Sequence, residues 1–186
     1  RQTHALDAHA DHIMLSLKDT TFHPVELGAR LRLSPDSILA QASAGDLELS
    51  VRSPHGLDSL TIYGHRLLQE IRTETDSLRL DQEKLRLMLP TLQVHLLCGT
   101  RNPVNNLLRS TIGYTFDQLH LDLDSSPAEG LTGDGHLYTL NTGAILLDTI
   151  QWDITQDPQG VALRSRITNG RRNRVVSFQS SFLARL

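Results

Sequence analysis

The chain has 186 residues, of which 39% are hydrophobic and only 4% aromatic, and its formal net charge at pH 7 is -3. A pI of about 6.3 leaves no overall positive field that would attract phosphates, and the few aromatic rings offer little surface on which bases could stack. Nucleic-acid binding is therefore disfavoured. The length allows one domain, or one compact portion of a larger protein, with its own core.

The two ends and the single cysteine bear on the protein's setting. Because the sequence starts at Arg1 and ends at Leu186 within a strand pattern, we expect a section of a longer protein. Cys98 has no cysteine to pair with and follows two leucines, which predicts a buried thiol. No apolar run approaches the length of a membrane span, about 18 residues or more, so any membrane anchor is expected outside this segment.

The N-terminal segment, residues 1–55, is predicted to form antiparallel strands. Apolar and polar side chains alternate in residues 13–17, 27–33 and 47–51, as in strands with one buried face. Turn-forming residues separate these runs: residues 19–24, Ser34-Pro35-Asp36 and Ala44-Gly45.

The middle segment, residues 56–113, changes to helical spacing. Apolar residues recur every three or four positions from Leu57, which predicts a helix over residues 57–75. Asp81 is a candidate N-cap of a second, short helix that Pro90 stops. Residues 92–96 alternate as a strand, and Asn102-Pro103 followed by Gly113 predicts the start and the end of a third helix.

The C-terminal segment, residues 114–186, gives the clearest pattern in the chain. Five alternating runs, at residues 116–123, 137–140, 145–154, 161–167 and 175–183, are separated by turn sequences such as Asn141-Thr142-Gly143 and Asn169-Gly170. No strand–helix alternation of the parallel kind is present. We therefore expect an α+β fold that is mainly β, an elongated, groove-like antiparallel meander with about three helices inserted in the middle.

The nine histidines and the aspartates are the candidate catalytic and metal-binding residues. His9, Asp11 and His12 are close in sequence, but neither an HExxH nor a CxxC motif accompanies them, so no metal site is predicted. His95, His120 and His136 are on the polar phase of their strands, where they are expected to face water or a cross-strand partner. The aspartates Asp117, Asp122, Asp124, Asp148 and Asp153 are likewise expected on exposed phases.

A glycine-rich segment and a group of arginines could each suggest a phosphate site. The glycines of residues 130–135 match neither the dinucleotide fingerprint nor a P-loop, and this segment is interpreted as a turn that leads into a strand. Arg171, Arg172 and Arg174 are interpreted as solvated side chains at a turn, not as a phosphate site. No GxSxG motif is present. We accordingly expect no catalytic residue and no cofactor.

The order and spacing of several segments resemble a known family. These segments are residues 102–109, residues 116–119, Ser126-Pro127-Ala128-Glu129-Gly130-Leu131-Thr132-Gly133-Asp134-Gly135, Leu147-Asp148-Thr149-Ile150 and residues 167–173 with Val176 and Phe178. From Gly45 onward the chain resembles the TamB family of translocation and assembly module subunits, in the AsmA-like superfamily of Gram-negative bacteria. These motifs are turn and strand sequences, and none names a catalytic residue.

The resemblance implies a large periplasmic protein that is anchored in the inner membrane by a segment outside this one. Its repeated strands would form a long groove with an apolar interior, which is linked to phospholipid passage toward the outer membrane and to assembly of outer-membrane proteins with a BamA-type barrel partner. The helices expected between Leu57 and Ile112 depart from a plain strand repeat.

A non-enzymatic lipid conduit is thus the first hypothesis, with acyl chains held by an apolar groove wall. The expected wall residues are Leu119, Leu121, Leu123, Leu137, Leu147, Ile150, Trp152, Ile154, Leu163 and Ile167. A structural or protein-docking module without a lipid groove is the alternative, because a covered sheet requires the same alternation. An enzyme acting on carbohydrate or phosphate is the least supported interpretation.

Overall fold

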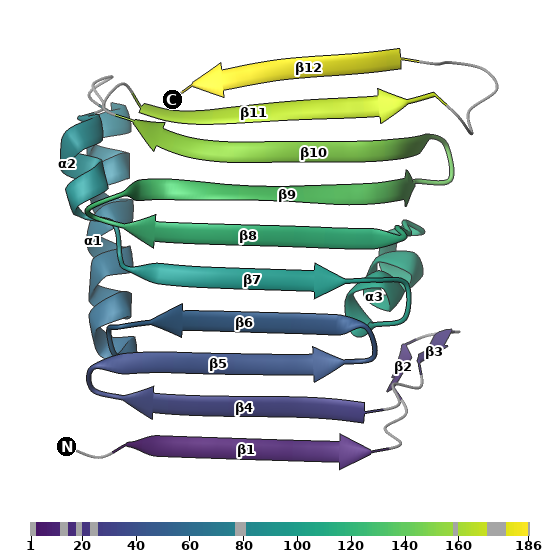
Figure 1. Cartoon of the computed structure of the whole chain (residues 1–186), viewed down its shortest axis with the longest axis horizontal. Coiled ribbons are helices and arrows are strands. Elements are labelled where there is room, and N and C mark those ends of the chain that lie inside the picture. Colours follow the sequence, from purple (N-terminus) through teal and green to yellow (C-terminus); the bar gives the residue numbers. More distant parts are fainter. Residues whose placement is uncertain are drawn as a thin grey trace.

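A computed structural model describes residues 3–11, 15–17, 20–22, 26–76, 81–157, 160–170 and 178–185. Ten of its strands form one open sheet in which neighbours in space are neighbours in the chain, apart from a short hairpin between the first two (Figure 1). All neighbouring strands are antiparallel. The expected fold class, a mainly β antiparallel meander with three helices, is confirmed.

The elements have the following bounds. The sheet contains β1 (His4–Asp11), β4 (Glu26–Ser34), β5 (Ser37–Ala44), β6 (Leu47–Ser53), β7 (Leu92–Cys98), β8 (Gln118–Ser126), β9 (Gly130–Asn141), β10 (Leu146–Asp157), β11 (Gly160–Asn169) and β12 (Phe178–Arg185), in that spatial order. The separate hairpin is β2 (Leu15–Leu17) with β3 (Thr20–Phe22), and the helices are α1 (Leu57–Asp76), α2 (Gln82–Leu87) and α3 (Pro103–Ile112).

The three segments distinguished in the sequence belong to one sheet. Strand β7, from the middle segment, pairs with β6 on one side and with β8 on the other. The N-terminal and C-terminal strands are therefore joined through β7 into a continuous surface, and the helices of the middle segment are inserted at the connections on either side of it.

Local capping chemistry places the helix ends where the sequence predicts them. The Asp81 side chain accepts a hydrogen bond from the backbone N–H of Lys84 at 3.0 Å, and α2 ends before Pro90. At the start of α3 the Asn102 side chain accepts a hydrogen bond from the backbone N–H of Asn105 at 3.0 Å, and Pro103 is at the first helical position. Gly113 ends α3 with a φ of 74°, a left-handed conformation that glycine adopts without strain.

Several strands differ from the sequence expectation. Strands β1 and β5 were not predicted, because their inward positions are largely alanine and give weak alternation. Strand β9 already begins at Gly130, so residues 130–135 are strand and not only a turn. Residues 12–14 and 171–177, with His12 and the three arginines Arg171, Arg172 and Arg174, lie outside the described residues.

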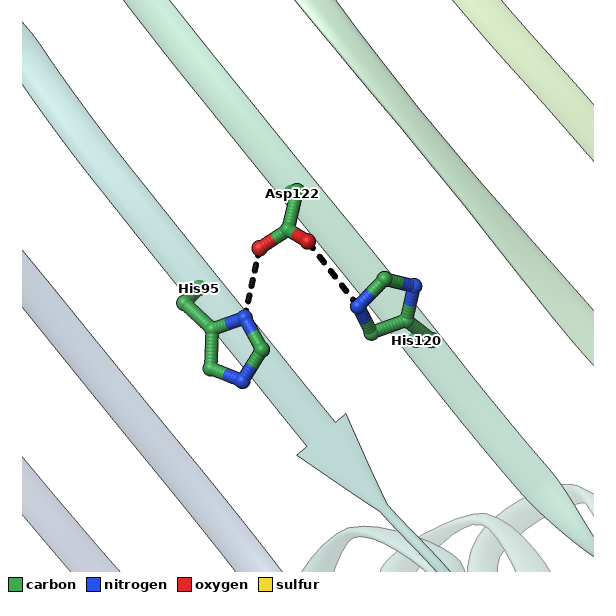
Figure 2. Close-up of side chains that lie close together, drawn as sticks. All are labelled: His95, His120 and Asp122. Atoms are coloured by element: carbon green, nitrogen blue, oxygen red, sulfur yellow. Dashed lines mark hydrogen bonds and ion pairs between the residues drawn. The ribbon is translucent and has the colours of Figure 1, made fainter.

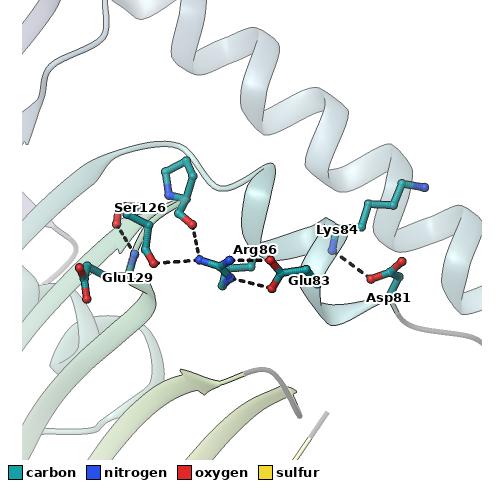
Figure 3. A network of polar contacts seen from close by, with 8 residues as sticks. Asp81, Glu83, Lys84, Arg86, Ser126 and Glu129 are labelled. Atoms are coloured by element: carbon teal, nitrogen blue, oxygen red, sulfur yellow. Dashed lines mark hydrogen bonds and ion pairs between the residues drawn. The ribbon is translucent and has the colours of Figure 1, made fainter.

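The helices lie beside the ends of the strands in the view of Figure 1, with α1 and α2 at one end and α3 at the other. Helix α2 is tied to the β8–β9 turn by Arg86 (Figure 3), whose guanidinium donates to the carbonyls of Pro127 at 2.5 Å and Ala128 at 2.8 Å. Glu83 holds the same guanidinium through two further hydrogen bonds, at 3.0 and 2.6 Å. This bidentate pair fixes where α2 docks.

A polar network joins α3 to the β5–β6 turn. Asn102, which is fully buried, donates to the Asp46 carboxylate at 2.7 Å and to the Gly99 carbonyl at 2.8 Å. Asn105 donates to the Phe116 carbonyl at 2.7 Å. Cys98 beside it is buried as expected, and burial together with the Asp46 charge raises the pKa of its thiol to about 11. The network connects both sides of β7 at this end of the sheet.

Replacing the buried asparagine tests this network. We expect Asn102→Ala to lower the free energy of unfolding by about 2 kcal/mol, because it removes the N-cap acceptor of the buried Asn105 N–H and the two hydrogen bonds that Asn102 donates to Asp46 and Gly99. Urea unfolding followed by circular dichroism measures the change. Asn106→Ala, on the same helix but with a half-buried side chain, serves as the control and should cost less than about 0.5 kcal/mol. Equal losses in both variants would contradict the assignment.

Acid should weaken the same network through Asp46. Burial alone raises the pKa of this carboxyl, but hydrogen bonds from Asn102 and from the backbone of Arg101 and Gly99 outweigh it and lower the pKa below its ordinary value. A lowered folded-state pKa stabilises the fold above the unfolded-state pKa, and this stabilisation is lost as the pH falls through the acid range below about 4. As the pH is lowered, the midpoint of urea unfolding should therefore fall less steeply in Asp46→Asn than in the unmodified protein. The same slope in both proteins would show that Asp46 contributes nothing.

Candidate functional site

The strand register brings most of the expected wall residues onto one face of the sheet. Residues directly opposite each other in an antiparallel pair point to the same side. Leu119 is opposite Leu137, which is opposite Ile150, which in turn is opposite Ile167. Leu121 is opposite Gly135, which is opposite Trp152. Leu123 is opposite Gly133, which is opposite Ile154, and Ile154 is opposite Leu163. Nine of the ten expected residues thus share a face.

Leu147 is the exception. It pairs with Leu140 and is three positions from Ile150. Because successive side chains of a strand alternate, an odd separation places Leu147 on the opposite face, with Thr149 and Gln151. Regular alternation thus separates Leu147 from the other nine expected wall residues, and its place in the wall stays a prediction.

The same face continues across the whole sheet as three rows. Each row takes one residue from each strand, in the order from β1 to β12. The first row is Leu6, Leu31, Ala40, Val51, Val94, Leu123, Gly133, Ile154, Leu163 and Ala184. The second row is Ala8, Ala29, Ala42, Leu49, Leu96, Leu121, Gly135, Trp152, Ser165 and Phe182. The third row is Ala10, Leu27, Ala44, Leu47, Cys98, Leu119, Leu137, Ile150, Ile167 and Ser180. We call these rows the apolar face. Its exceptions to apolar character are two glycines and two serines.

The apolar face is only partly shielded from solvent. The nine wall residues that share it are half-buried, and none belongs to the fully buried class. At the edges, Leu6 is 57% and Phe182 is 48% exposed. Among the members of the three rows, only Ala44 and Cys98, at the ends of strands, are buried hydrophobic residues. A closed core over the strand middles is therefore not present in the part of the chain that the structure describes.

A glycine makes room for a large side chain on this face. A Cβ on Gly135 would lie 2.6 Å from two indole carbons of Trp152 and 2.5 Å from the carbonyl oxygen of His120. Trp152, the only tryptophan of the chain, therefore lies over the Gly135 position of the neighbouring strand. This explains why glycine stands in the middle of β9, where a strand would otherwise favour a side chain.

The opposite face is polar and carries ion pairs between neighbouring strands. Arg30 pairs with Asp7 and Arg164 with Asp153, each at 3.2 Å. On β1, His9 contacts Asp11 at 3.0 Å, while His12 of the same sequence cluster lies outside the described residues. Such exposed pairs contribute little stability individually, about 0 to 1 kcal/mol, but they mark this face as the solvated one.

Histidines and one aspartate gather at the centre of the polar face. Asp122 of β8 lies between His95 of β7, at 2.5 Å, and His120 of its own strand, at 3.0 Å (Figure 2). The His120 ring contacts the His136 ring of β9, with centroids 5.0 Å apart. Hydrogen bonding to His95 lowers the pKa of Asp122, and burial with the nearby His120 lowers the pKa of His136.

The other expected acids do not converge into one pocket. Asp122, Asp134 and Asp153 follow one another across β8, β9 and β10 on the polar face, whereas Asp148 accepts a hydrogen bond from the Gly170 N–H at 2.8 Å at the sheet's end. The contact of His95 with Asp122 was not predicted as a pair, since the two residues are 27 positions apart. Only the register of β7 on β8 brings them together.

Comparison with family models, with curated proteins and with solved structures found no match for this chain. Among the described helices, none combines the length and the apolar character needed to cross a bilayer. The described part of the chain is an open antiparallel meander with one apolar and one polar face.

The Gly135 position gives a direct test of the apolar face. We expect Gly135→Ala to lower the free energy of unfolding by about 1 to 3 kcal/mol, because the new methyl group displaces Trp152 and presses on the β8 backbone. The emission of Trp152 should shift to longer wavelength as the ring moves into water. Gly64→Ala, in α1, is the matched control, since nothing lies within 4 Å of its new Cβ; it should leave emission unchanged. Unchanged emission in Gly135→Ala would contradict the packing.

Proposed function

We propose that this chain carries phospholipid acyl chains along its apolar face, as a non-enzymatic section of a TamB-like periplasmic bridge. The observation that supports the proposal is the continuation of three mainly apolar rows over all ten strands, with leucine and isoleucine side chains that stay half-buried along the strand middles. A protein core would bury such rows completely. A surface that receives an acyl chain leaves them accessible.

The chemistry of the face suits an aliphatic ligand. Leucine, isoleucine, valine and alanine dominate the rows, and the only rings are those of Trp152 and Phe182. Burial of each methylene of an acyl chain contributes about 0.8 kcal/mol without any directional contact. Such a surface would bind an acyl chain with similar strength at every position along the rows. This favours movement of the lipid along the rows over binding at one fixed site.

The direction of the path follows from the rows, which run across the strands. With neighbouring strands about 4.8 Å apart, the rows extend for about 43 Å, more than the length of one acyl chain, since a bilayer core of two chains is about 30 Å thick. Both ends of the path are open, because β1 and β12 each have a partner on one side only among the described strands. Further strands added at these edges would lengthen it.

The cellular setting belongs to the same proposal. We infer a periplasmic protein anchored in the inner membrane by a segment outside this one, with a BamA-type barrel protein as partner in outer-membrane protein assembly. The support for this setting is the motif resemblance. The proposal includes no cofactor and no catalytic residue.

A structural or protein-docking module is the second candidate. The open edges of β1 and β12 favour it, because an unpaired strand edge can bind an extended segment of another protein through backbone hydrogen bonds. In that case the apolar face would be covered by protein and not by lipid.

Photo-crosslinking at paired positions separates the two. A photoreactive amino acid at Leu121 or Ile150, on the apolar face, should capture phospholipid when the protein is exposed to vesicles or produced in cells. His120 and Gln151 precede or follow these positions by one residue and lie on the polar face, so they serve as matched controls. Lipid adducts are identified by mass spectrometry.

The outcomes are distinct. Lipid adducts at Leu121 and Ile150 with none at His120 and Gln151 support carriage on the apolar face. Protein adducts at the apolar positions in place of lipid would favour the docking module. Equal lipid labelling on both faces would contradict the proposed path.

A further inference from the structure

The cluster at the centre of the polar face has the composition of a metal site. One ring nitrogen of His95, one of His120 and a carboxylate oxygen of Asp122 all lie within 4.8 Å of one another. The nitrogens that contact the carboxylate are His95 Nδ1 and His120 Nε2. Figure 2 shows the Asp122 carboxylate between the two imidazole rings. We propose that these three side chains bind Zn²⁺, or a divalent ion of similar ligand preference, and so connect β7 to β8.

The donor set and the spacing fit that ion. Zinc binds histidine nitrogen and carboxylate oxygen at about 2.0 to 2.2 Å, commonly with three protein ligands and a water molecule. Two ligands of a tetrahedral zinc are then about 3.3 Å apart. Asp122 Oδ1 is 2.5 Å from His95 Nδ1, and Asp122 Oδ2 is 3.0 Å from His120 Nε2. Each of these contacts would have to widen by less than about 1 Å to reach the ligand spacing of a zinc site.

The scaffold positions the ligands and leaves the site accessible. His95 is directly opposite Asp122 in the ladder, and His120 is on the same face two positions before Asp122, so paired strands hold all three. The side chains of His95 and Asp122 are 44% and 43% exposed, and that of His120 is 20% exposed. A hollow of about 310 Å³, lined by His95, Asp122 and Asp124 among others, gives water and an ion a route to the site.

Charged side chains of both signs surround the three ligands. Asp134 of β9 is directly opposite Asp122, and Asp124, which accepts a hydrogen bond from Gln93, follows it on the same face of β8. Arg52 of β6 lines the same hollow and carries the opposite charge. His120 Nδ1 has no hydrogen-bond partner among the described residues, and the ring can therefore adjust over an ion without breaking a second hydrogen bond. The His136 ring beside it offers a further nitrogen.

No metal site is predicted from the amino-acid sequence alone. It also does not depend on lipid carriage, because the ligands occupy the opposite face from the three apolar rows. What recommends it over an ordinary cross-strand contact is the convergence of two imidazoles on one carboxylate with room for an ion on the open side.

Titration of the purified, chelator-treated protein with zinc chloride in a calorimeter tests the site. We expect one ion per chain with an affinity that falls at least tenfold in Asp122→Asn and that is lost in the double variant His95→Ala/His120→Ala. Cobalt, used as a spectroscopic substitute, should give the visible absorption of a four-coordinate ion. His9→Ala and His65→Ala, at exposed histidines away from the cluster, should bind as the unmodified protein does.

A measurement on the unmodified protein keeps the proposal testable if the double variant does not fold. Histidine side-chain nitrogen shifts in NMR should show zinc on Nδ1 of His95 and on Nε2 of His120. No binding by the unmodified protein, binding unaffected in the folded double variant, or zinc-dependent shifts confined to other histidines would each overturn the proposal and leave the cluster as a hydrogen-bonded contact between strands.

Discussion

The parity of strand pairing is the constraint on which the rest of this structure depends. A slip of one residue in any ladder would turn the apolar side chains of that strand to the other face. Two-residue turns, at Pro35-Asp36 and Gly45-Asp46, set the register of β4, β5 and β6. Between β6, β7 and β8, the helices are inserted beyond the strand ends, and the pairing continues in phase across them. Without this agreement over ten strands, no continuous apolar surface would exist.

The separation of the faces divides the molecule's chemistry. The aliphatic rows and Trp152 are on one side, and the ion pairs and the histidine cluster are on the other. The helices are held at the ends of the strands, α2 by Arg86 and α3 by Asn102, so their fixed positions leave the middles of the strands accessible. The lipid proposal and the metal proposal rest on different faces, and each can fail without the other.

Local chemistry explains what could be predicted from the sequence. The alternation of the C-terminal strands and the caps at Asp81, Asn102 and Gly113 depend on neighbouring residues, and the structure has these elements where they were expected. Alanine-rich β1 and β5 gave no strong alternation. The glycines of β9 suggested a turn, because the side chain that explains Gly135, that of Trp152, lies on another strand. The phase of Leu147 and the meeting of His95 with Asp122 depend on register, which no short segment encodes by itself.

The central claim concerns one central strand. Every second residue of it belongs to an apolar surface that lipid can reach, and the residues between them face water. Spin labels placed singly at residues 118–124 of β8, with the protein bound to phospholipid, measure this by their accessibility to oxygen and to a water-soluble nickel chelate. The account predicts a period of two, with oxygen dominant at Leu119, Leu121 and Leu123 and the chelate dominant between them. Uniform exposure to the chelate, or the opposite phase, would contradict it.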